Sequence, residues 1–217
     1  MQLTWLGQSC FKIETKGNGE SVTVVIDPFG DDIGLTMPKI KADIALISHD
    51  HFDHNNLDAL KGEPFVIRGS GEYEVKQVVV YGVPTWHDDK NGAERGPNTC
   101  FRIDAEDLTV VHLGDLGHAL TDQQLDLLEG ADILLIPVGG TYTLNAKQAS
   151  EVVSQIEPRL VIPMHYAIPG LKIDLDAVTP FLKEMGVPKA ASVDKLKVTK
   201  KELQAEDLHV VVLNQSA

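Results

Sequence analysis

The stretch His49-Asp50-His51-Phe52-Asp53-His54 decides how this sequence is interpreted, because it gathers three of the chain's eight histidines into six positions. Neutral imidazole and carboxylate groups are suitable ligands for zinc, and also for manganese or iron. Residues this close in a loop cannot all bind one ion comfortably. The pattern therefore predicts two adjacent divalent ions, most simply zinc, with His49 and His51 facing one and Asp53 and His54 facing the other. The alternative is a solvated loop rich in acidic residues and histidine.

Polar residues also follow four other predicted strands. They are Asp27 after Ser21–Ile26, His87 after Gln77–Tyr81, Asp115 after Leu108–Leu113 and His165 after Leu160–Ile162. Rigid strands that end in ligand-bearing loops can converge at one edge of a sheet. We therefore expect His87 to complete the ligands of the first ion and His165 those of the second. Asp115, on a tight turn after a glycine, is expected to bridge the two ions.

Other residues are expected near this site in supporting roles. Asp27 is expected to accept a hydrogen bond from a ligand imidazole and so fix its tautomer, although Ile26-Asp27-Pro28 could also be a simple turn. His118 and Tyr142 are candidates for contacting the substrate, with a surface position as the alternative for His118. His112 lies inside a predicted strand, so we expect a core or supporting histidine and not a ligand.

The composition is that of an ordinary globular protein, with 43% hydrophobic and 24% charged residues. No linker or repeat divides the chain, so residues 1–217 are expected to form one domain. No apolar run reaches the roughly 20 residues that span a bilayer, and the N-terminus lacks a signal-peptide pattern, which predicts a cytoplasmic protein without a membrane partner. Cys10 and Cys100 are expected to be buried free thiols, since a single possible pair is no disulfide framework.

The net charge of −13 makes long nucleic acid an unfavourable partner. The predicted centre reverses this picture locally. Two divalent ions would contribute about +4, of which the carboxylates of Asp53 and Asp115 offset roughly half. A small anionic substrate is therefore expected at this site.

The apolar pattern predicts strands in the first half and a mixture of helices and strands in the second. Further strands are expected at Ile44–Ile47, Leu3–Leu6, Cys10–Thr15, Pro64–Ile67, Cys100–Ile103, Ile133–Ile136 and Leu208–Leu213. Helices are expected to begin at Thr121, with Gln124 completing a capping box, and to lie near Asn145–Ile156 and Asp176–Met185. Asn145 and Asp176 are the expected N-caps, and Gly186 is the expected C-cap. Such interspersed elements indicate an α/β protein with helices covering sheets.

Once assembled, these residues resemble the metallo-β-lactamase fold superfamily. The resemblance rests on Asp27, the His49–His54 motif, His87, Gly114-Asp115 and Pro163-Met164-His165-Tyr166, in family order. The length and the stretch Ile136-Pro137-Val138-Gly139-Gly140 are similar to the small branch around the L-ascorbate-6-phosphate lactonases. The resemblance implies a four-layer αββα sandwich of two mixed sheets with helices on the outer faces and metals at one edge. Small members of this family often assemble, so a homo-oligomer is a possible outcome.

Departures from the family pattern narrow the expected chemistry. Antibiotic-hydrolysing members typically carry cysteine, or lack a carboxylate, where Asp115 stands, so we expect β-lactamase action at most as a weak side activity. Flavin-diiron relatives typically place glutamate where His51 stands, which argues against oxygen chemistry. The usual Gly-Asp-Thr is Gly114-Asp115-Leu116 here, so substrate contacts on that loop are expected to differ.

The expected function is hydrolysis of a small ester, lactone or phosphoester by a hydroxide that bridges the two ions. Asp53 and Asp115 are the candidate catalytic carboxylates, Asp115 as the bridge and Asp53 to orient the water or carry its proton. One alternative is a phosphodiesterase or nuclease that acts on short nucleic acid. Another alternative, from a different class, is a non-catalytic module. Its metals would only stabilise the fold, or the module would serve as a ligand sensor.

Overall fold

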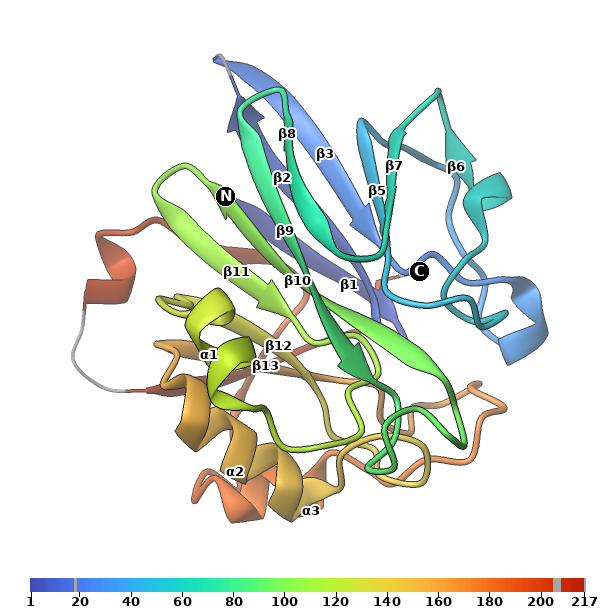
Figure 1. The fold of residues 1–217 in the computed structure, drawn as a ribbon, viewed down its shortest axis with the longest axis vertical. Coiled ribbons are helices and arrows are strands. Elements are labelled where there is room, and N and C mark those ends of the chain that lie inside the picture. The colour runs from blue at the N-terminus through green and yellow to red at the C-terminus, as the bar shows by residue number, and fades with distance from the viewer. Residues whose placement is uncertain (18, 205–207, 217) are drawn as a thin grey trace.

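The computed structural model describes residues 1–17, 19–204 and 208–216, and two mixed sheets dominate it (Figure 1). The strands of the first sheet are β1 Gln2–Gly7, β2 Cys10–Gly17, β3 Glu20–Ile26, β5 Ile44–Ile47, β7 Phe65–Arg68 and β15 Leu196–Lys197. Their order is β15-β1-β2-β3-β5-β7. β1 to β3 are antiparallel neighbours, whereas β3, β5 and β7 run parallel.

The second sheet has eight strands. They are β8 Gly71–Val75, β9 Val78–Trp86, β10 Pro97–Ala105, β11 Leu108–His112, β12 Ile133–Pro137, β13 Leu160–Met164, β14 Ala191–Val193 and β16 His209–Leu213. Their order is β14-β16-β13-β12-β11-β10-β9-β8. β9 runs on to Trp86, beyond the predicted end at Tyr81. β8 accompanies β9 only as far as Gly82, so Pro84 lies where β9 has a free edge that tolerates a residue without an N–H.

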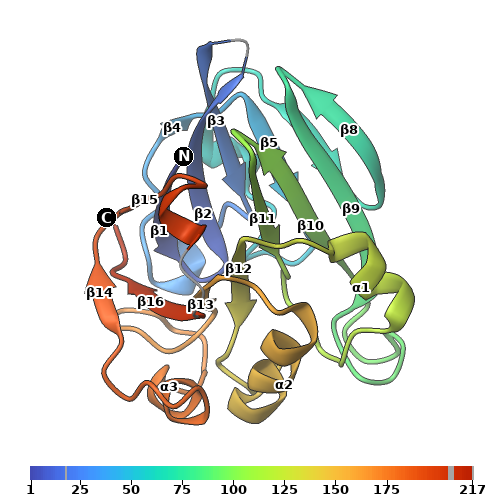
Figure 2. The ribbon, with the colours of Figure 1, turned by 90° about the vertical axis from the view of Figure 1, so that its left-hand side faces the viewer.

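Three helices lie on the side of the second sheet (Figure 2). α1 (Asp122–Leu128) contacts β9, α2 (Ala146–Ile156) contacts β12, and α3 (Thr179–Glu184) contacts α2. The capping box predicted at Thr121 and the N-cap predicted at Asn145 are both present, and Asn145 forms a capping box with Gln148 as well. No helix in the described part of the chain is both long enough and apolar enough to cross a membrane.

The N-cap predicted at Asp176 is wrong, because α3 begins only at Thr179 and its side chains provide no cap. The backbone of Asp176 is engaged elsewhere: its N–H donates to Gly139 O, and its carbonyl accepts the N–H of Ala167, at 2.8 and 2.9 Å. These bonds hold Asp176 against the backbone of Gly139 and Ala167 before the helix begins. The C-cap of α3 is Met185, one residue before the predicted Gly186, and the chain leaves the helix at Gly186, where φ is +72° and the N–H donates to Lys183 O.

The core fills the space between the sheets, with Trp5, Phe11 and Phe101 among its fully buried side chains. Since strand side chains alternate between faces, a second apolar cluster forms on the outer face of the first sheet, around Phe29 and Ile33. Short 3-10 helices at Asp31–Ile33 and Leu57–Ala59, with the strand pair β4 Ile40–Lys41 and β6 Leu60–Lys61, occupy this side. A further 3-10 helix spans Glu202–Gln204. The predicted four-layer αββα fold class is confirmed. Among the described residues, the layer outside the first sheet contains 3-10 helices in place of α-helices.

Both cysteines are buried and free, as predicted. Burial raises the pKa of the Cys100 thiol to about 12. Cys10 packs in the outer cluster and Cys100 in the main apolar cluster. Neither thiol is therefore poised as a nucleophile.

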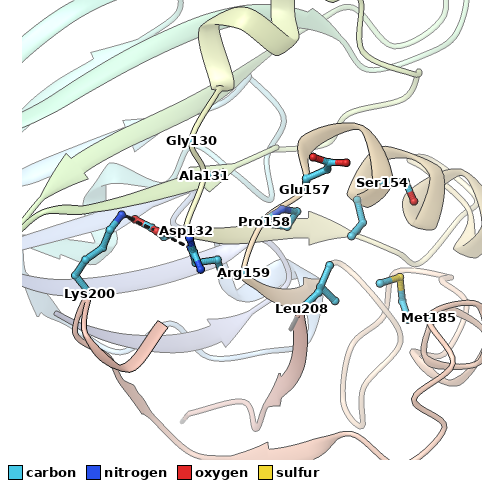
Figure 3. Close-up of a pocket in the computed structure, with 11 residues that line it drawn as sticks. Gly130, Ala131, Asp132, Ser154, Glu157, Pro158, Arg159, Met185, Lys200 and Leu208 are labelled. Atoms are coloured by element: carbon cyan, nitrogen blue, oxygen red, sulfur yellow. Dashed lines mark hydrogen bonds and ion pairs between the residues drawn. The ribbon is translucent and has the colours of Figure 1, made fainter. Parts of the chain in front are cut away.

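A buried carboxylate joins strands at the end of the second sheet where β12 and β13 begin (Figure 3). The carboxylate of Asp132 accepts a hydrogen bond from the N–H of Thr109 at 3.0 Å, and both of its oxygens accept from Lys200 Nζ at 2.8 Å. It lines a cavity of about 730 Å³. Its own backbone N–H donates to Thr109 O. Asp132 thus connects β11, β12 and the C-terminal segment.

Replacing this carboxylate should weaken the fold. Asp132→Ala leaves the N–H of Thr109 without its acceptor, so the free energy of unfolding should fall by about 1–3 kcal/mol in urea denaturation. The control is Asp126→Ala on the exposed face of α1, which should change stability by less than about 0.5 kcal/mol. Equal effects of the two substitutions would contradict the role given to Asp132.

Candidate metal centre

The structure brings all seven predicted ligands to one place, at the carboxyl ends of strands from both sheets. The stretch 49–54 follows β5, and the other residues follow β9, β11 and β13. Three groups have ligand atoms within 4.8 Å of one another: His49, His51 and His87; Asp53, His54 and His165; and His49, His54 and Asp115. The first two groups are the two sets of ligands expected from the sequence. The third connects them.

Asp115 lies at the centre of this arrangement. Its Oδ2 atom is 3.1 Å from His165 Nε2, 3.2 Å from His87 Nε2 and 3.3 Å from His54 Nε2. His49 Nε2 lies 3.9 Å away. Burial alone would raise the pKa of Asp115, but the facing imidazoles of His165 and His54 hold it well below its ordinary value. The carboxylate is therefore ionised and faces members of both groups.

Asp27 orients two of the imidazoles. Its Oδ2 accepts the Ser48 hydroxyl at 2.6 Å and the Nδ1–H of His54 at 3.0 Å. Since the Ser48 hydroxyl is donating to Asp27, its lone pair accepts the Nδ1–H of His49 at 2.9 Å. Both rings thereby direct Nε2 toward Asp115, and in the neutral His49 ring that nitrogen carries the lone pair. The supporting role expected of Asp27 has this geometric basis, and we retain it as a proposal.

Electrostatics favour a positive charge among these groups. Burial lowers the pKa of His49 to about 3, with the neighbouring His54 adding to the effect. Burial also opposes protonation of His54, but the carboxylates of Asp115 and Asp53 outweigh it and raise its pKa well above the ordinary value. The His49 imidazole is thus neutral and offers a lone pair, whereas the His54 imidazole is surrounded by negative charge. A cation between them would satisfy both.

The side-chain atoms fit such a cation. Among the described residues, His49 Nε2 and His54 Nε2 are buried and have no hydrogen-bond partner. Buried polar atoms are normally paired, so unpaired ring nitrogens that face ionised carboxylates point to a cation. Imidazole and carboxylate donors suit zinc, manganese and iron. The donor set therefore fits the metals predicted from the sequence.

The turn between β1 and β2 also supports the site, which sequence patterns did not reveal. Gln8 Nε2 donates to Asp53 Oδ2 at 2.8 Å, and Ser9 Oγ donates to Asp115 Oδ1 at 3.1 Å. His112 Nε2 donates to Ser9 O at 2.8 Å while its Nδ1 accepts the N–H of Gly114, the supporting role expected of it. The available signal was a polar Gln8-Ser9 pair between two apolar strands.

Backbone strain accompanies several of these positions. Gln8, Asp27 and His165 have φ values of +52°, +47° and +51°, a region that non-glycine residues seldom occupy. The peptide of His165 packs closely on Gly139. A Cβ added to Gly139 would lie only 2.1 Å from His165 O. Strain of this kind concentrates at functional sites, where the surrounding structure enforces it.

The centre opens into a cavity of about 570 Å³. His51, Asp53, His87, Asp115 and His165 line it, and so does Tyr142, the predicted substrate contact.

His118 does not line this cavity. Its Nε2 accepts the N–H of Trp86 at 3.1 Å, and its Nδ1 lies 2.7 Å from Ala119 O. Both ring nitrogens are thus occupied by backbone, and the substrate contact predicted for His118 finds no support.

Removing the charge of Asp27 should weaken metal binding. In Asp27→Asn the hydrogen bonds that orient His54 and Ser48 are disturbed, so affinity for zinc should fall about 10- to 100-fold in competition with a chelator. Asp43→Asn is the control, because Asp43 pairs with Lys76 and Thr23 at the start of β5. If Asp27→Asn binds zinc as tightly as the wild-type protein, Asp27 does not position the ligand imidazoles.

Comparisons with known proteins identify the family of this chain. A family model of the beta-lactamase superfamily domain matches residues 2–165. A UPF0173 metal-dependent hydrolase of Desulforamulus reducens is 31% identical over 198 residues, covering 76% of this chain and 84% of the relative. A UPF0173 relative from Methanopyrus kandleri is 27% identical over 219 residues, covering 86% and 94%. A candidate zinc-dependent hydrolase of the metallo-β-lactamase superfamily from Thermotoga maritima has a crystal structure with a TM-score of 0.78 at 36% identity, covering 98% of this chain and 97% of that chain. The chain belongs to the metallo-β-lactamase superfamily of metal-dependent hydrolases.

Proposed function

We propose that this hydrolase holds two divalent ions, zinc in the first instance, and cleaves a small ester, lactone or phosphoester. The observation that carries the proposal is the Asp115 carboxylate, which faces both ligand groups at the bottom of an open cavity. His49, His51 and His87 would hold one ion. Asp53, His54 and His165 would hold the other, with Asp115 between them.

The bound ions would supply a water activated at neutral pH and a Lewis acid for the electrophile's oxygen. The chain's own residues provide orientation and proton transfer. Asp53 lines the cavity and receives a hydrogen bond from Gln8, so its carboxylate is held in place. Burial alone would raise the pKa of Asp53, but His54 lowers it below its ordinary value. We assign Asp53, which this shift keeps ionised, the orientation of the attacking water and the transient transfer of its proton to the leaving oxygen.

In this reaction the water oxygen forms a bond to the carbonyl carbon or phosphorus, and the bond to the leaving oxygen breaks. The proton taken up by Asp53 passes to the leaving oxygen. The cavity volume of about 570 Å³ suits a small molecule. The net charge of −13 remains unfavourable for long nucleic acid. The narrower resemblance to ascorbate-6-phosphate lactonases stays a prediction, since none of the relatives described above carries that name.

A catalytic role is favoured over a purely structural metal site. Structural sites enclose their ion with protein ligands, whereas catalytic sites keep an open position. Here five of the seven candidate ligands line a cavity. A molecule in that cavity could therefore reach the ligands directly.

Activity should depend on the metal and on the assigned ligands. The zinc-loaded protein should hydrolyse at least one member of a panel of lactones, p-nitrophenyl esters, p-nitrophenyl phosphodiesters, β-lactams and short nucleic acids. Chelation should abolish this activity and added metal should restore it. His51→Ala should lower kcat/KM by roughly 100-fold or more, because residues that act as a unit lose most of their effect together.

The matched control is His209→Ala, an exposed histidine on β16, which should keep wild-type activity. Wild-type rates in His51→Ala would show that the site is wrongly assigned. A fully loaded protein that is inert toward the whole panel would favour the non-catalytic module. If the protein prefers short nucleic acids or β-lactams, the proposed substrate class is wrong.

A further inference from the structure

An arginine lies in the wall of the cavity into which the metal ligands open. Arg95 shares the cavity lining with His51, His87 and Tyr142. Its guanidinium carbon is 5.6 Å from the centre of the Tyr142 ring, and its Nη2 donates to Thr141 O at 3.3 Å. A guanidinium that stacks on an aromatic ring and is held by a carbonyl is oriented before a ligand arrives.

The loop that carries Arg95 is fixed by one buried carboxylate. Asp88 accepts backbone N–H groups from four residues at 2.8–2.9 Å, namely Lys90, Gly92, Glu94 and Arg95. Burial would raise the pKa of Asp88, but these N–H groups lower it to about 2. The N–H of His87 donates to Gly96 O, which closes the loop. Arg95 is thus held at a defined position relative to the candidate ligand His87.

Most of the hydrogen-bonding capacity of Arg95 is free for a ligand. Guanidinium has five N–H donors, and within the described ranges its side chain donates only to Thr141 O. The nearest acid is Glu94, whose carboxylate lies 3.9 Å from Nη1. Glu94 is also paired with Lys90, so the charge of Arg95 is not neutralised.

The remaining lining residues supply little other anion-binding charge. Lys172 and Asp174 both line the cavity and together add no net formal charge. Phe52, which is 61% exposed, and Ile173 add apolar surface. The cavity therefore combines a reactive end at the candidate ligands, an apolar wall and one oriented cation.

We propose that Arg95, stacked on Tyr142, binds the carboxylate or phosphate group of a small substrate whose scissile bond lies at the candidate metal ligands. A guanidinium fork matches the two oxygens of such groups. This inference rests on the proposed function and deepens it. The substrate is an acyl or phosphoryl ester that carries a second, anionic group at the end of a short carbon chain.

The test uses zinc-loaded protein and three p-nitrophenyl esters of equal reach: a pentanoate, which is neutral, a glutarate monoester with a terminal carboxylate, and a 4-phosphonobutanoate. Wild-type protein should prefer the anionic esters, and the ratio between the last two separates carboxylate from phosphate recognition. In Arg95→Gln, KM for the preferred anionic ester should rise about 10- to 100-fold. Because this binding is remote from the scissile bond, kcat and the rate with the neutral ester should change little.

The matched control is Arg102→Gln. Arg102 also lies over a tyrosine, 5.5 Å from the Tyr81 ring centre, and pairs with Asp104, but it does not line the cavity. Its KM values should stay at wild-type level for all three esters. Arg95→Lys, which keeps the charge but loses the fork, should fall between wild type and Arg95→Gln.

A second measurement separates this inference from the proposed function. Calorimetric titration with free glutarate should show binding to wild-type and Arg102→Gln protein and at least tenfold weaker binding to Arg95→Gln. If all esters resist hydrolysis while glutarate binding depends on Arg95, the proposed function fails and the anion site stands. An equal loss for neutral and anionic esters, or glutarate binding that ignores Arg95, overturns the inference.

Discussion

The buried carboxylate of Asp115 sets the condition that the rest of the site must meet. It lies within 3.3 Å of imidazole nitrogens from three separate loops, and a fourth imidazole stands at 3.9 Å. A buried, ionised carboxylate is costly unless positive charge accompanies it. Without a metal, protonation of His54 would have to supply that charge, since Asp115 and Asp53 raise its pKa. Cations between the carboxylate and the rings would supply it instead, which is why we propose metal binding at this position.

The strands meet this condition by bringing distant parts of the chain together. Each candidate ligand outside the 49–54 stretch directly follows a strand or lies on the turn after one. The strained backbone at Asp27 and His165, and the tight contact of His165 with Gly139, keep the donors in place. Hydrogen bonds from Gln8 and Ser9 then fix the two carboxylates. The site is thus held by both sheets at once.

Much of this arrangement could be predicted from the sequence, because ligand types and strand ends are local signals. The His49–His54 stretch identified the chemistry, and periodicity located most strands. The roles of Gln8, Ser9 and Asn98 were not visible, since each depends on a partner far away in the chain. Asn98, for example, accepts the N–H of Asp115. The N-cap at Asp176 failed for the same reason, because backbone bonds to Gly139 and Ala167 outweigh the local capping signal.

The proposed position of Asp115 between two cations can be observed in a crystal structure of the zinc-loaded protein, with an anomalous difference map recorded at the zinc edge. We expect two peaks about 3.5–4 Å apart, one beside His49, His51 and His87 and the other beside Asp53, His54 and His165. A single peak at full occupancy, or peaks away from Asp115, would contradict it.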